Sequence, residues 1–306
     1  MTNLSAEATP VGFIGLGAMG SAIARRLIEA GHLLVVNDID RSRATDWTKA
    51  GAVFAGAAAE VAQTCRIVFL SLPGPREVEA VATGPGGLAD GARLGDVVVD
   101  LSTNAYATVV RLAREMDRSG VSFVDAPVSG GLAGAVKGRL AVMAGGEPAV
   151  VEALDPLFKA FAARVFHVGP AGQGTIAKLV NNQIFLSAAV AVQEGFVLAA
   201  KAGLNAELML EILKASSGGG YVGLAPTFFA RDFDSPMFKL ALAAKDVRVA
   251  LESAQALGVP MPVTTAAGAV YEDAVAKGLG EKVFYATLRA LETDAGVEVA
   301  RLSPKP

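Results

Sequence analysis

A lysine and an asparagine, Lys178 and Asn182, lie four residues apart in a long apolar stretch of the chain. If this stretch is a helix, both side chains lie on one face, one turn apart, and can reach the same ligand. A lysine can exchange a proton with an alcohol, and an asparagine amide can hold an oxygen in place. Taken alone, the pattern favours a lysine that extends to solvent and an asparagine that bends the helix or lies at an interface.

A second group of residues can offer hydrogen-bond donors to an anion. Ser129, Gly130 and Gly131 follow the apolar run Ser122 to Asp125, and we expect them to form a loop at the carboxyl end of a strand. Ligands of open α/β sheets bind at such ends. The serine hydroxyl and the two glycine N–H groups can hold a carboxylate, whereas a plain flexible turn is the alternative.

A glycine motif lies near the start of the chain. The motif is Gly15-Leu16-Gly17-Ala18-Met19-Gly20, and it follows the run Val11 to Ile14 and precedes a predicted helix from Ser21 to Ala30. At a strand-to-helix turn, the first glycine allows the tight turn, the second admits a pyrophosphate and the third lets the helix pack closely. Because 34 glycines make chance matches common, the position of the motif after the first strand carries the prediction of dinucleotide binding.

An acidic residue at the end of the second predicted strand bears on the choice of dinucleotide. Asp38 lies 18 residues after the last motif glycine, where a carboxylate binds ribose hydroxyls and repels a 2′-phosphate. Ile39 follows it instead of an arginine, so the sequence favours NAD over NADP. In the alternative, Asp38 caps the next helix and Asp40 binds the ribose. Arg41 and Arg43 lie close enough that NADP stays possible.

The elements that must position these residues fall into two parts. Up to Gly169 short β-branched runs alternate with amphipathic stretches, which predicts a mostly parallel sheet covered by helices on both faces. Beyond it the strand pattern ends, and Thr175 to Lys201 is predicted to be one long helix. We expect an α/β fold, in which a Rossmann-type doubly wound domain (1–170) is linked by this helix to an all-α domain (171–306) for substrate binding and oligomerisation. The predicted strands are Val11–Ile14, Leu33–Asn37, Ile67–Leu70, Val97–Asp100, Ser122–Asp125, Leu140–Met143 and Val165–Val168.

Composition narrows the possible partners and compartment. The chain has 306 residues, 52% hydrophobic and 19% charged, with a net charge of -3, so nothing in it suggests nucleic-acid binding. The first ten residues lack a secretory signal, and Cys65 is the only cysteine, so we expect a cytoplasmic protein. Gln193 and Glu194 interrupt the most apolar stretch, which argues against a membrane span. His32 and His167 have no metal-site spacing, so we expect no metal.

Four motifs in order resemble the β-hydroxyacid dehydrogenase family, which includes 3-hydroxyisobutyrate dehydrogenase and tartronate semialdehyde reductase. The resemblance covers nearly the whole chain. It implies that Ser129, Gly130 and Gly131 bind the substrate carboxylate, that Lys178 gives and takes the proton, and that Asn182 hydrogen-bonds the substrate. The motifs are Phe13-Ile14-Gly15-Leu16-Gly17-Ala18-Met19-Gly20, Asp125-Ala126-Pro127-Val128-Ser129-Gly130-Gly131, Gly172-Gln173-Gly174-Thr175-Ile176-Ala177-Lys178-Leu179-Val180-Asn181-Asn182, and Lys245-Asp246.

The resemblance also assigns residues outside the glycine motif to the cofactor. It implies that the loops at Leu72-Pro73 and Ser102-Thr103 contact the ribose and nicotinamide, although turn formation and helix capping also explain them. It further implies that Lys245 reaches substrate and cofactor across a cleft, the alternative being an ion pair with Asp246. The expected cofactor-binding residues are Gly15, Leu16, Gly17, Ala18, Met19, Gly20, Asp38, Leu72, Pro73, Ser102, Thr103 and Lys245.

The motifs and the resemblance together predict an oxidoreductase. We expect it to transfer a hydride between NAD(H) and a small 3-hydroxy acid or its semialdehyde or ketone, with Lys178 as general acid and base. An imine reductase is the nearest rival, but such enzymes generally lack this lysine. A non-catalytic nucleotide-binding module is the alternative from another class. Because Phe185 to Ala200 is too apolar to face water, we also expect a homodimer or homotetramer.

Overall fold

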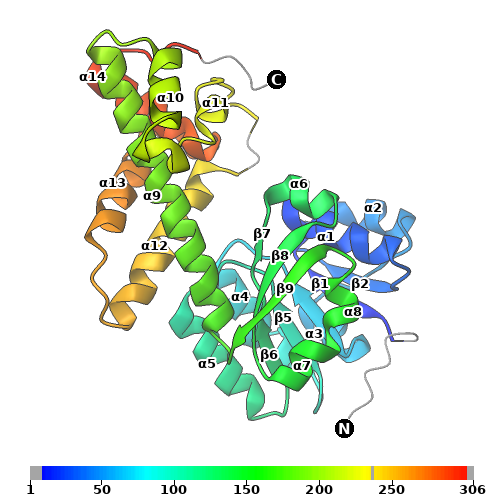
Figure 1. Ribbon diagram of the computed structural model, residues 1–306. Helices are drawn as coiled ribbons and strands as arrows, with labels where there is room; N and C mark the ends of the chain where they lie inside the picture. The colour runs from blue at the N-terminus through cyan, green and yellow to red at the C-terminus, as the bar shows by residue number, and fades with distance from the viewer. Residues whose placement is uncertain (1–8, 236–237, 302–306) are drawn as a thin grey trace. The chain divides into compact units, whose positions relative to one another are not determined.

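The computed structural model describes residues 9–235 and 238–301 of the chain. It divides into two compact units, Met1–Leu179 and Val180–Pro306. Figure 1 shows that the first unit contains a sheet with helices and that the second is built of helices. The long helix α9, Gln173–Lys201, spans the division between the two units.

The sheet of the first unit has the strand order β3-β2-β1-β4-β5-β6-β8-β7, and β9 pairs with β8. Neighbouring strands from β3 to β6 are parallel, β8 runs antiparallel to β6 and β7, and β9 is parallel to β8. The strands are β1 (Val11–Ile14), β2 (Leu34–Asn37), β3 (Val53–Phe54), β4 (Ile67–Leu70), β5 (Val97–Asp100), β6 (Ser122–Asp125), β7 (Val128–Ser129), β8 (Leu140–Gly145) and β9 (Ala162–Gly169).

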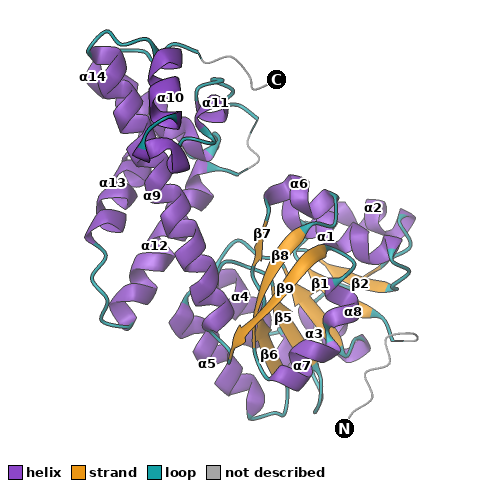
Figure 2. Ribbon diagram, viewed as in Figure 1, coloured by secondary structure: helices purple, strands orange, loops and turns teal. Residues whose placement is uncertain are grey.

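Helices cover both faces of this sheet, as Figure 2 shows. One hydrophobic core joins the sheet to α1 (Ala18–Glu29), α2 (Ala44–Lys49), α6 (Gly131–Val136), α7 (Pro148–Ala153) and α8 (Asp155–Phe158). A second core joins it to α3 (Ala58–Thr64), α4 (Pro75–Thr83) and α5 (Tyr106–Asp117). Because both faces are covered, every residue of β1 and β5 is buried, and the strands are continuous apolar runs instead of alternating ones. The predicted doubly wound, mostly parallel fold is confirmed.

Five strands end in register along one edge of the sheet. Asn37 pairs with Ile14, Ile14 with Leu70, Leu70 with Asp100, and Asp100 with Asp125. The segments that follow these residues therefore leave the sheet side by side. We call this row of strand ends the carboxyl edge, and it is where open α/β sheets bind ligands.

The second unit has a helical core of its own. Its buried residues come from the later part of α9 and from α10 (Ala206–Lys214), α11 (Ala225–Phe228), α12 (Leu240–Ala256), α13 (Pro262–Ala274) and α14 (Thr287–Ala295). Two buried hydroxyl groups in this core are hydrogen-bonded. The Tyr271 hydroxyl donates to the Leu186 carbonyl at 3.2 Å. The buried Thr287 hydroxyl likewise donates to Gln193 at 2.7 Å.

The structure corrects several boundaries expected from the sequence. Ser129 was expected in a loop but lies in the short strand β7, which pairs with β8. Helix α1 begins at Ala18, inside the glycine motif, and not at Ser21. Helix α9 begins at Gln173, so the glycine-rich segment expected to precede it is partly its first turn. A short 3₁₀ helix, Ser217–Tyr221, follows α10.

Candidate functional site

The three motif glycines meet three different spatial requirements. Gly15 has a φ of +95°, and a Cβ there would lie 2.2 Å from the Ser71 carbonyl oxygen. A Cβ on Gly20 would lie 2.0 Å from the Gly15 carbonyl oxygen, so only glycine lets α1 pack this closely on the turn. At Gly17, by contrast, a Cβ would meet nothing within 4 Å, and the residue is exposed. Gly17 is thus where the backbone is open to a ligand.

This turn fits a dinucleotide pyrophosphate. Helix α1 starts at Ala18, so the N–H groups of its first turn point toward the open space beside Gly17. That first turn holds no acidic side chain that would repel a phosphate. The turn therefore offers backbone donors and a helix dipole to the phosphates.

Among the described residues no group of His, Cys, Asp and Glu side chains could hold a metal ion.

Asp38 is tied to the same turn. One of its carboxylate oxygens accepts a hydrogen bond from the Leu16 N–H at 2.6 Å, and the other accepts from the Asp40 N–H at 2.8 Å. Asp40, not Asp38, caps the next helical turn by accepting from the Ser42 N–H at 3.1 Å. The capping role considered for Asp38 thus belongs to Asp40. Asp38 lies directly after β2, where the sequence motif predicts a ribose ligand.

An arginine that the sequence did not assign to the site lies beside Asp38. The Arg43 guanidinium donates to the Leu16 carbonyl at 2.9 Å, and it lies 3.2 Å from the Asp40 carboxylate and 3.8 Å from that of Asp38. It therefore places a positive charge beside the carboxylates that follow β2. The sequence placed Arg43 near Asp38, but its contacts with the Leu16 carbonyl and the Asp40 carboxylate could not be predicted from it.

The loops after β4 and β5 are joined by a hydrogen bond. The Leu72 N–H donates to the Ser102 hydroxyl oxygen at 2.9 Å. The buried carboxylate of Asp100 accepts from the Ser102 N–H at 2.9 Å and from the Asn104 amide at 2.8 Å. Ser102 is itself buried, whereas Pro73 is exposed and Leu72 is half-buried. Asp100 and Asn104 thus shape the loop expected to contact the cofactor, a role that the sequence did not reveal.

The segment expected to bind the substrate carboxylate follows β6 and includes the short strand β7. Ser129 ends β7 and is half-buried, and the next two residues, Gly130 and Gly131, are exposed. Their φ angles are +127° and +65°, a region that favours glycine. The chain therefore turns sharply here and exposes successive backbone groups, as a carboxylate site requires.

Lys178 lies in the second turn of α9, and the beginning of that helix is bound to the sheet. The Asp125 carboxylate, at the end of β6, accepts from the Gly172 N–H at 2.7 Å and from the Thr175 N–H at 2.6 Å. The pKa of Asp125 is raised to about 7: burial is the main cause, the hydrogen bonds from Gly172 and Thr175 act in the opposite direction, and the charge of Asp100 adds to the rise. The sequence motif contains Asp125, but its partners lie 47 and 50 residues away.

The predicted residues of the second unit form a side-chain network. The Asn182 amide donates to the Asp246 carboxylate at 2.7 Å, and the Asn181 amide donates to the Asn182 oxygen at 3.0 Å. The Lys245 ammonium lies 2.7 Å from the other Asp246 oxygen. The ion pair considered as the alternative role of Lys245 is therefore present. Asp246, which is 4% exposed, holds both Lys245 and Asn182.

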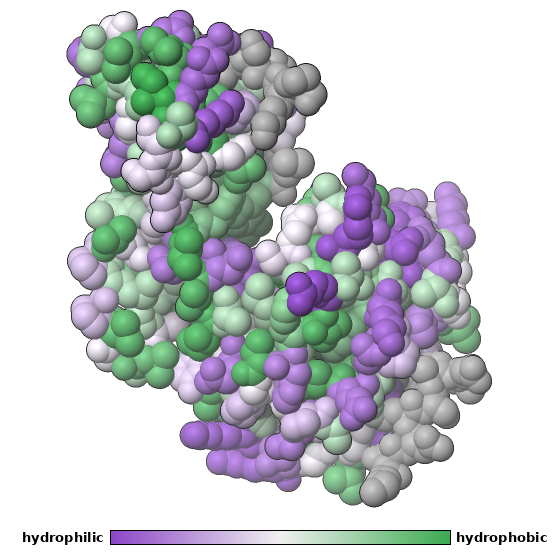
Figure 3. Space-filling model, viewed as in Figure 1, coloured by the Kyte–Doolittle hydropathy of each residue, from purple (hydrophilic) through white to green (hydrophobic). Residues whose placement is uncertain are grey.

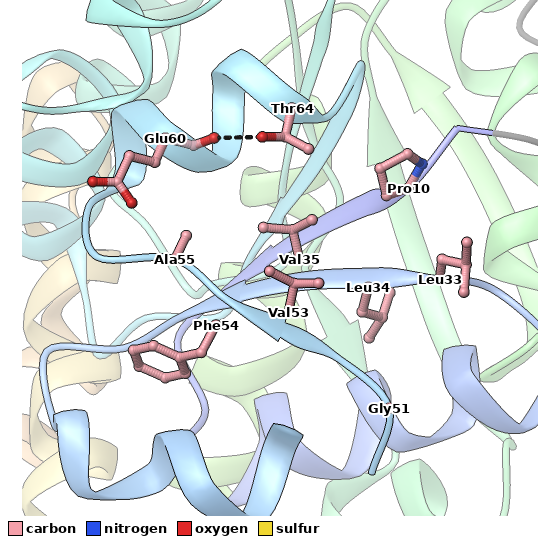
Figure 4. Close-up of a pocket in the computed structure, with 10 residues that line it drawn as sticks. All are labelled: Pro10, Leu33, Leu34, Val35, Gly51, Val53, Phe54, Ala55, Glu60 and Thr64. Carbon is pink, nitrogen blue, oxygen red and sulfur yellow. Dashed lines mark hydrogen bonds between the residues drawn. The ribbon is translucent and has the colours of Figure 1, made fainter. Parts of the chain in front are cut away.

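A cavity of about 380 Å³ lies elsewhere on the first unit, beside β2 and β3 (Figure 4). Its walls are mostly apolar, and its two polar residues are engaged locally. The Glu60 carboxylate accepts from the Gly56 N–H at 2.7 Å, and the Thr64 hydroxyl donates to the Glu60 carbonyl at 3.0 Å. No residue of the candidate site lines it. Its lining residues are Pro10, Leu33, Leu34, Val35, Gly51, Val53, Phe54, Ala55, Glu60 and Thr64.

The first unit thus gathers most of the expected residues. The glycine turn, Asp38, the loops at Leu72 and Ser102, and the Ser129 segment all follow the carboxyl edge, and Lys178 lies on the helix that Asp125 binds to that edge. Asn182 and Lys245 belong to the second unit and are linked there through Asp246.

Two protein-family models match the chain. Residues 10–169 match the NAD binding domain of 6-phosphogluconate dehydrogenase. Residues 172–291 match the NAD-binding domain of NADP-dependent 3-hydroxyisobutyrate dehydrogenase. Together the two matches cover both units of the chain.

Individual relatives resemble the chain over nearly its full length. It is 35% identical to 2-(hydroxymethyl)glutarate dehydrogenase of Eubacterium barkeri, over 95% of this chain and 97% of that protein. It is 34% identical to the NAD-dependent L-serine dehydrogenase of Pseudomonas aeruginosa, over 94% of this chain and 99% of that protein. A solved structure of Mycobacterium tuberculosis 3-hydroxyisobutyrate dehydrogenase with L-serine is 28% identical, covers 92% of this chain and 99% of its own, and has a TM-score of 0.83.

Proposed function

The chain belongs to the β-hydroxyacid dehydrogenase family of NAD(P)-dependent oxidoreductases, and from this premise we propose that it oxidises primary alcohols of the form HO–CH₂–CH(R)–COO⁻. The names of the relatives support this substrate class. 2-(Hydroxymethyl)glutarate, L-serine and 3-hydroxyisobutyrate differ in R, but each has a hydroxymethyl group on the carbon that bears the carboxylate. These three substrates are distinguished by the group R.

The proposed reaction converts the hydroxymethyl group to an aldehyde. The alcohol carbon loses a hydride and its hydroxyl loses a proton, which gives OHC–CH(R)–COO⁻. NAD⁺, when bound, would be the acceptor of this hydride. The protein must hold the carboxylate, orient the hydroxyl and take the proton.

We assign these three tasks to residues expected from the sequence. Ser129, Gly130 and Gly131 hold the substrate carboxylate through the serine hydroxyl and backbone N–H groups. Lys178 accepts the hydroxyl proton and returns it in the reducing direction. Asn182 orients the substrate oxygen, and Lys245 provides a second positive charge for the anionic substrate.

One observation carries this assignment. The substrate segment after β6 and the helix that bears Lys178 are both anchored at the carboxyl end of the same strand, the helix through Asp125. The glycine turn and Asp38 follow the same edge of the sheet. A carboxylate site, a proton donor and a dinucleotide site on one rigid edge are what this chemistry requires.

For the cofactor we propose NAD, with NADP used less efficiently. Asp38 occupies the ribose position and would repel a 2′-phosphate. Arg43 gives such a phosphate one cationic neighbour, but that arginine is already engaged by two carboxylates and the Leu16 carbonyl. The charges at this position therefore favour binding of the ribose hydroxyls of NAD over the 2′-phosphate of NADP.

We also propose a cytoplasmic homodimer or homotetramer that binds neither nucleic acid nor a membrane. Hydrophobic patches lie on the face of the helical unit seen in Figure 3, and Ile184 and Leu198 of α9 are 54% and 72% exposed. A second copy of the chain would cover such residues. Among the described residues, α9 is the helix long and apolar enough to cross a membrane, by length and composition only. Because α9 contributes buried residues to the core of the helical unit, we expect it to pack there and not to cross a membrane.

A substrate screen tests the proposal. The purified protein is incubated with NAD⁺ and, in turn, 3-hydroxyisobutyrate, L-serine, glycerate, threonate, 4-hydroxybutyrate and 2-(hydroxymethyl)glutarate, while NADH absorbance is followed. We expect turnover with at least one acid that carries the HO–CH₂–CH(R)–COO⁻ group. A parallel assay follows the consumption of NADH or NADPH with a cyclic imine, and a fluorescence titration measures NADH binding. Activity only with the imine would favour the imine reductase alternative, and NADH binding without any turnover would favour a non-catalytic module.

A further inference from the structure

Asp125 is a buried carboxylate that the proposed reaction does not use directly. It is 1% exposed and lies at the end of β6, next to Asp100 at the end of β5. Burial beside another carboxylate disfavours its charge, which is why its pKa is raised to about 7. Burying a charged carboxylate costs free energy unless the group is hydrogen-bonded. The hydrogen bonds of Asp125 come from two backbone N–H groups at the start of α9.

The α9 start is held against the sheet by steric fit as well. A Cβ on Gly174 would lie 2.2 Å from the Met143 carbonyl oxygen and 2.5 Å from the Asp125 carbonyl oxygen. The backbone of the first helical turn therefore packs directly on the ends of β6 and β8. With the hydrogen bonds at 2.7 Å and 2.6 Å, this contact leaves the first turn little freedom to shift.

The geometry points to Asp125 as the positioning residue that fixes Lys178 relative to the substrate-binding segment. Thr175, whose N–H Asp125 accepts, precedes Lys178 by three residues, which is less than one helical turn. Asp125 also begins the segment that runs through β7 to Gly131. One side chain thus sets the separation between the proposed carboxylate site and the proposed proton donor. This inference rests on the function proposed above for those two groups.

The test replaces Asp125 by asparagine and compares it with a matched control. Asp125→Asn has the same size, but it offers one acceptor oxygen and turns an amide NH₂ toward the other backbone N–H. Asp96→Asn is the control, because Asp96 is also buried in the first unit and its carboxylate accepts the Arg93 N–H at 2.7 Å, but at the other end of β5. Asp125→Ser is a second variant, since its smaller side chain fits the same space and cannot reach both N–H groups.

Two readouts are measured on the full-length protein. In hydrogen–deuterium exchange, Asp125→Asn should speed exchange of the amides of residues 172–179, and Asp96→Asn should not. In steady-state kinetics on the acid identified by the screen, Asp125→Asn should lower kcat about 10- to 100-fold, while the NADH dissociation constant stays within about twofold. Asp125→Ser should speed exchange and lower kcat in the same way. Asp96→Asn should keep a kcat near that of the wild type.

The outcomes separate this inference from the proposed function. Unchanged exchange at 172–179 in both Asp125 variants, or a kcat within about twofold of the wild type, would overturn the positioning role. A loss of kcat in Asp96→Asn equal to that in Asp125→Asn would overturn it as well, because the effect would then reflect general destabilisation. If the wild type oxidises no hydroxy acid, the proposed function fails, and the exchange experiment still reports whether Asp125 holds the helix.

Discussion

The polar groups of the two units are held in different ways. At the carboxyl edge of the sheet, buried or half-buried carboxylates accept hydrogen bonds from backbone N–H groups: Asp38 from Leu16 and Asp100 from Ser102. In the helical unit, Asp246 is bound by the side chains of Asn182 and Lys245. The position of a backbone N–H is set by the fold, whereas a side-chain partner can change its rotamer. We therefore expect the sheet edge to tolerate substitution less than the helical network does.

The largest expected difference is between the two lysines. Lys178→Ala should lower kcat by ~10²–10⁴-fold with nearly native NADH affinity, because the proton partner of the alcohol is lost. Lys178→Arg should fail too, since a guanidinium keeps its proton near neutral pH. Lys245→Ala should act mainly by raising KM, because it removes one charge that attracts the substrate. Steady-state kinetics give kcat and KM for each variant, and NADH titration gives its cofactor affinity. A Lys178→Arg enzyme that keeps most of its activity would contradict the proton-transfer role.

A pair of glycine substitutions compares the two units in stability. Gly20→Ala should destabilise the protein by about 1–3 kcal/mol and weaken NADH binding, because its Cβ would lie 2.0 Å from the Gly15 carbonyl oxygen. Gly195→Ala in α9 should stabilise it by about 0.5–1 kcal/mol, because a Cβ there meets nothing within 4 Å. Urea unfolding monitored by circular dichroism measures both. Destabilisation by Gly195→Ala would instead indicate that a second copy packs closely on this position.

A smaller change is expected when the ribose position is altered. Asp38→Ser with Ile39→Arg should shift the ratio of kcat/KM values toward NADP by about 10-fold, because one repulsive charge is removed and a phosphate partner is added. Ile39→Arg alone is the control for the added charge. The ratio is measured with saturating hydroxy acid and either cofactor. A wild-type enzyme that uses NADP as well as NAD would show that Arg43, and not Asp38, dominates this position.

The stability of the protein should also depend on pH. The pKa of Asp125 is about 7 in the folded protein and 3.8 in its ordinary state, so between these values the folded state binds more protons than the unfolded state. The contribution of Asp125 to the free energy of unfolding should therefore fall as pH rises from about 4 to 7, by at most ~1.4 kcal/mol per pH unit. Asp125→Asn should remove this contribution. The difference between the two unfolding free energies across the range isolates it, and a constant difference would contradict the raised pKa.

The sequence predicted the parts of this protein that depend on local patterns. The seven longer strands, the glycine turn and the long helix follow from runs of β-branched residues, glycine spacing and apolar periodicity. The strands β3 and β7 have two residues each, too few to produce a pattern. The roles of Asp125 and Arg43 depend on contacts with residues far along the chain, and only the folded sheet brings those partners together. The placement of Ser129 in a strand likewise comes from its pairing with β8.

The position of the division between the units has a consequence for recombination. Domain boundaries usually lie in flexible loops, where segments of related proteins can be exchanged. Here the division after Leu179 falls inside α9 and separates Lys178 from Asn182, which are one helical turn apart. A chimaera joined at that point would combine a lysine from one parent with an asparagine from another. Such hybrids should therefore work only when the whole of α9 is inherited from a single parent.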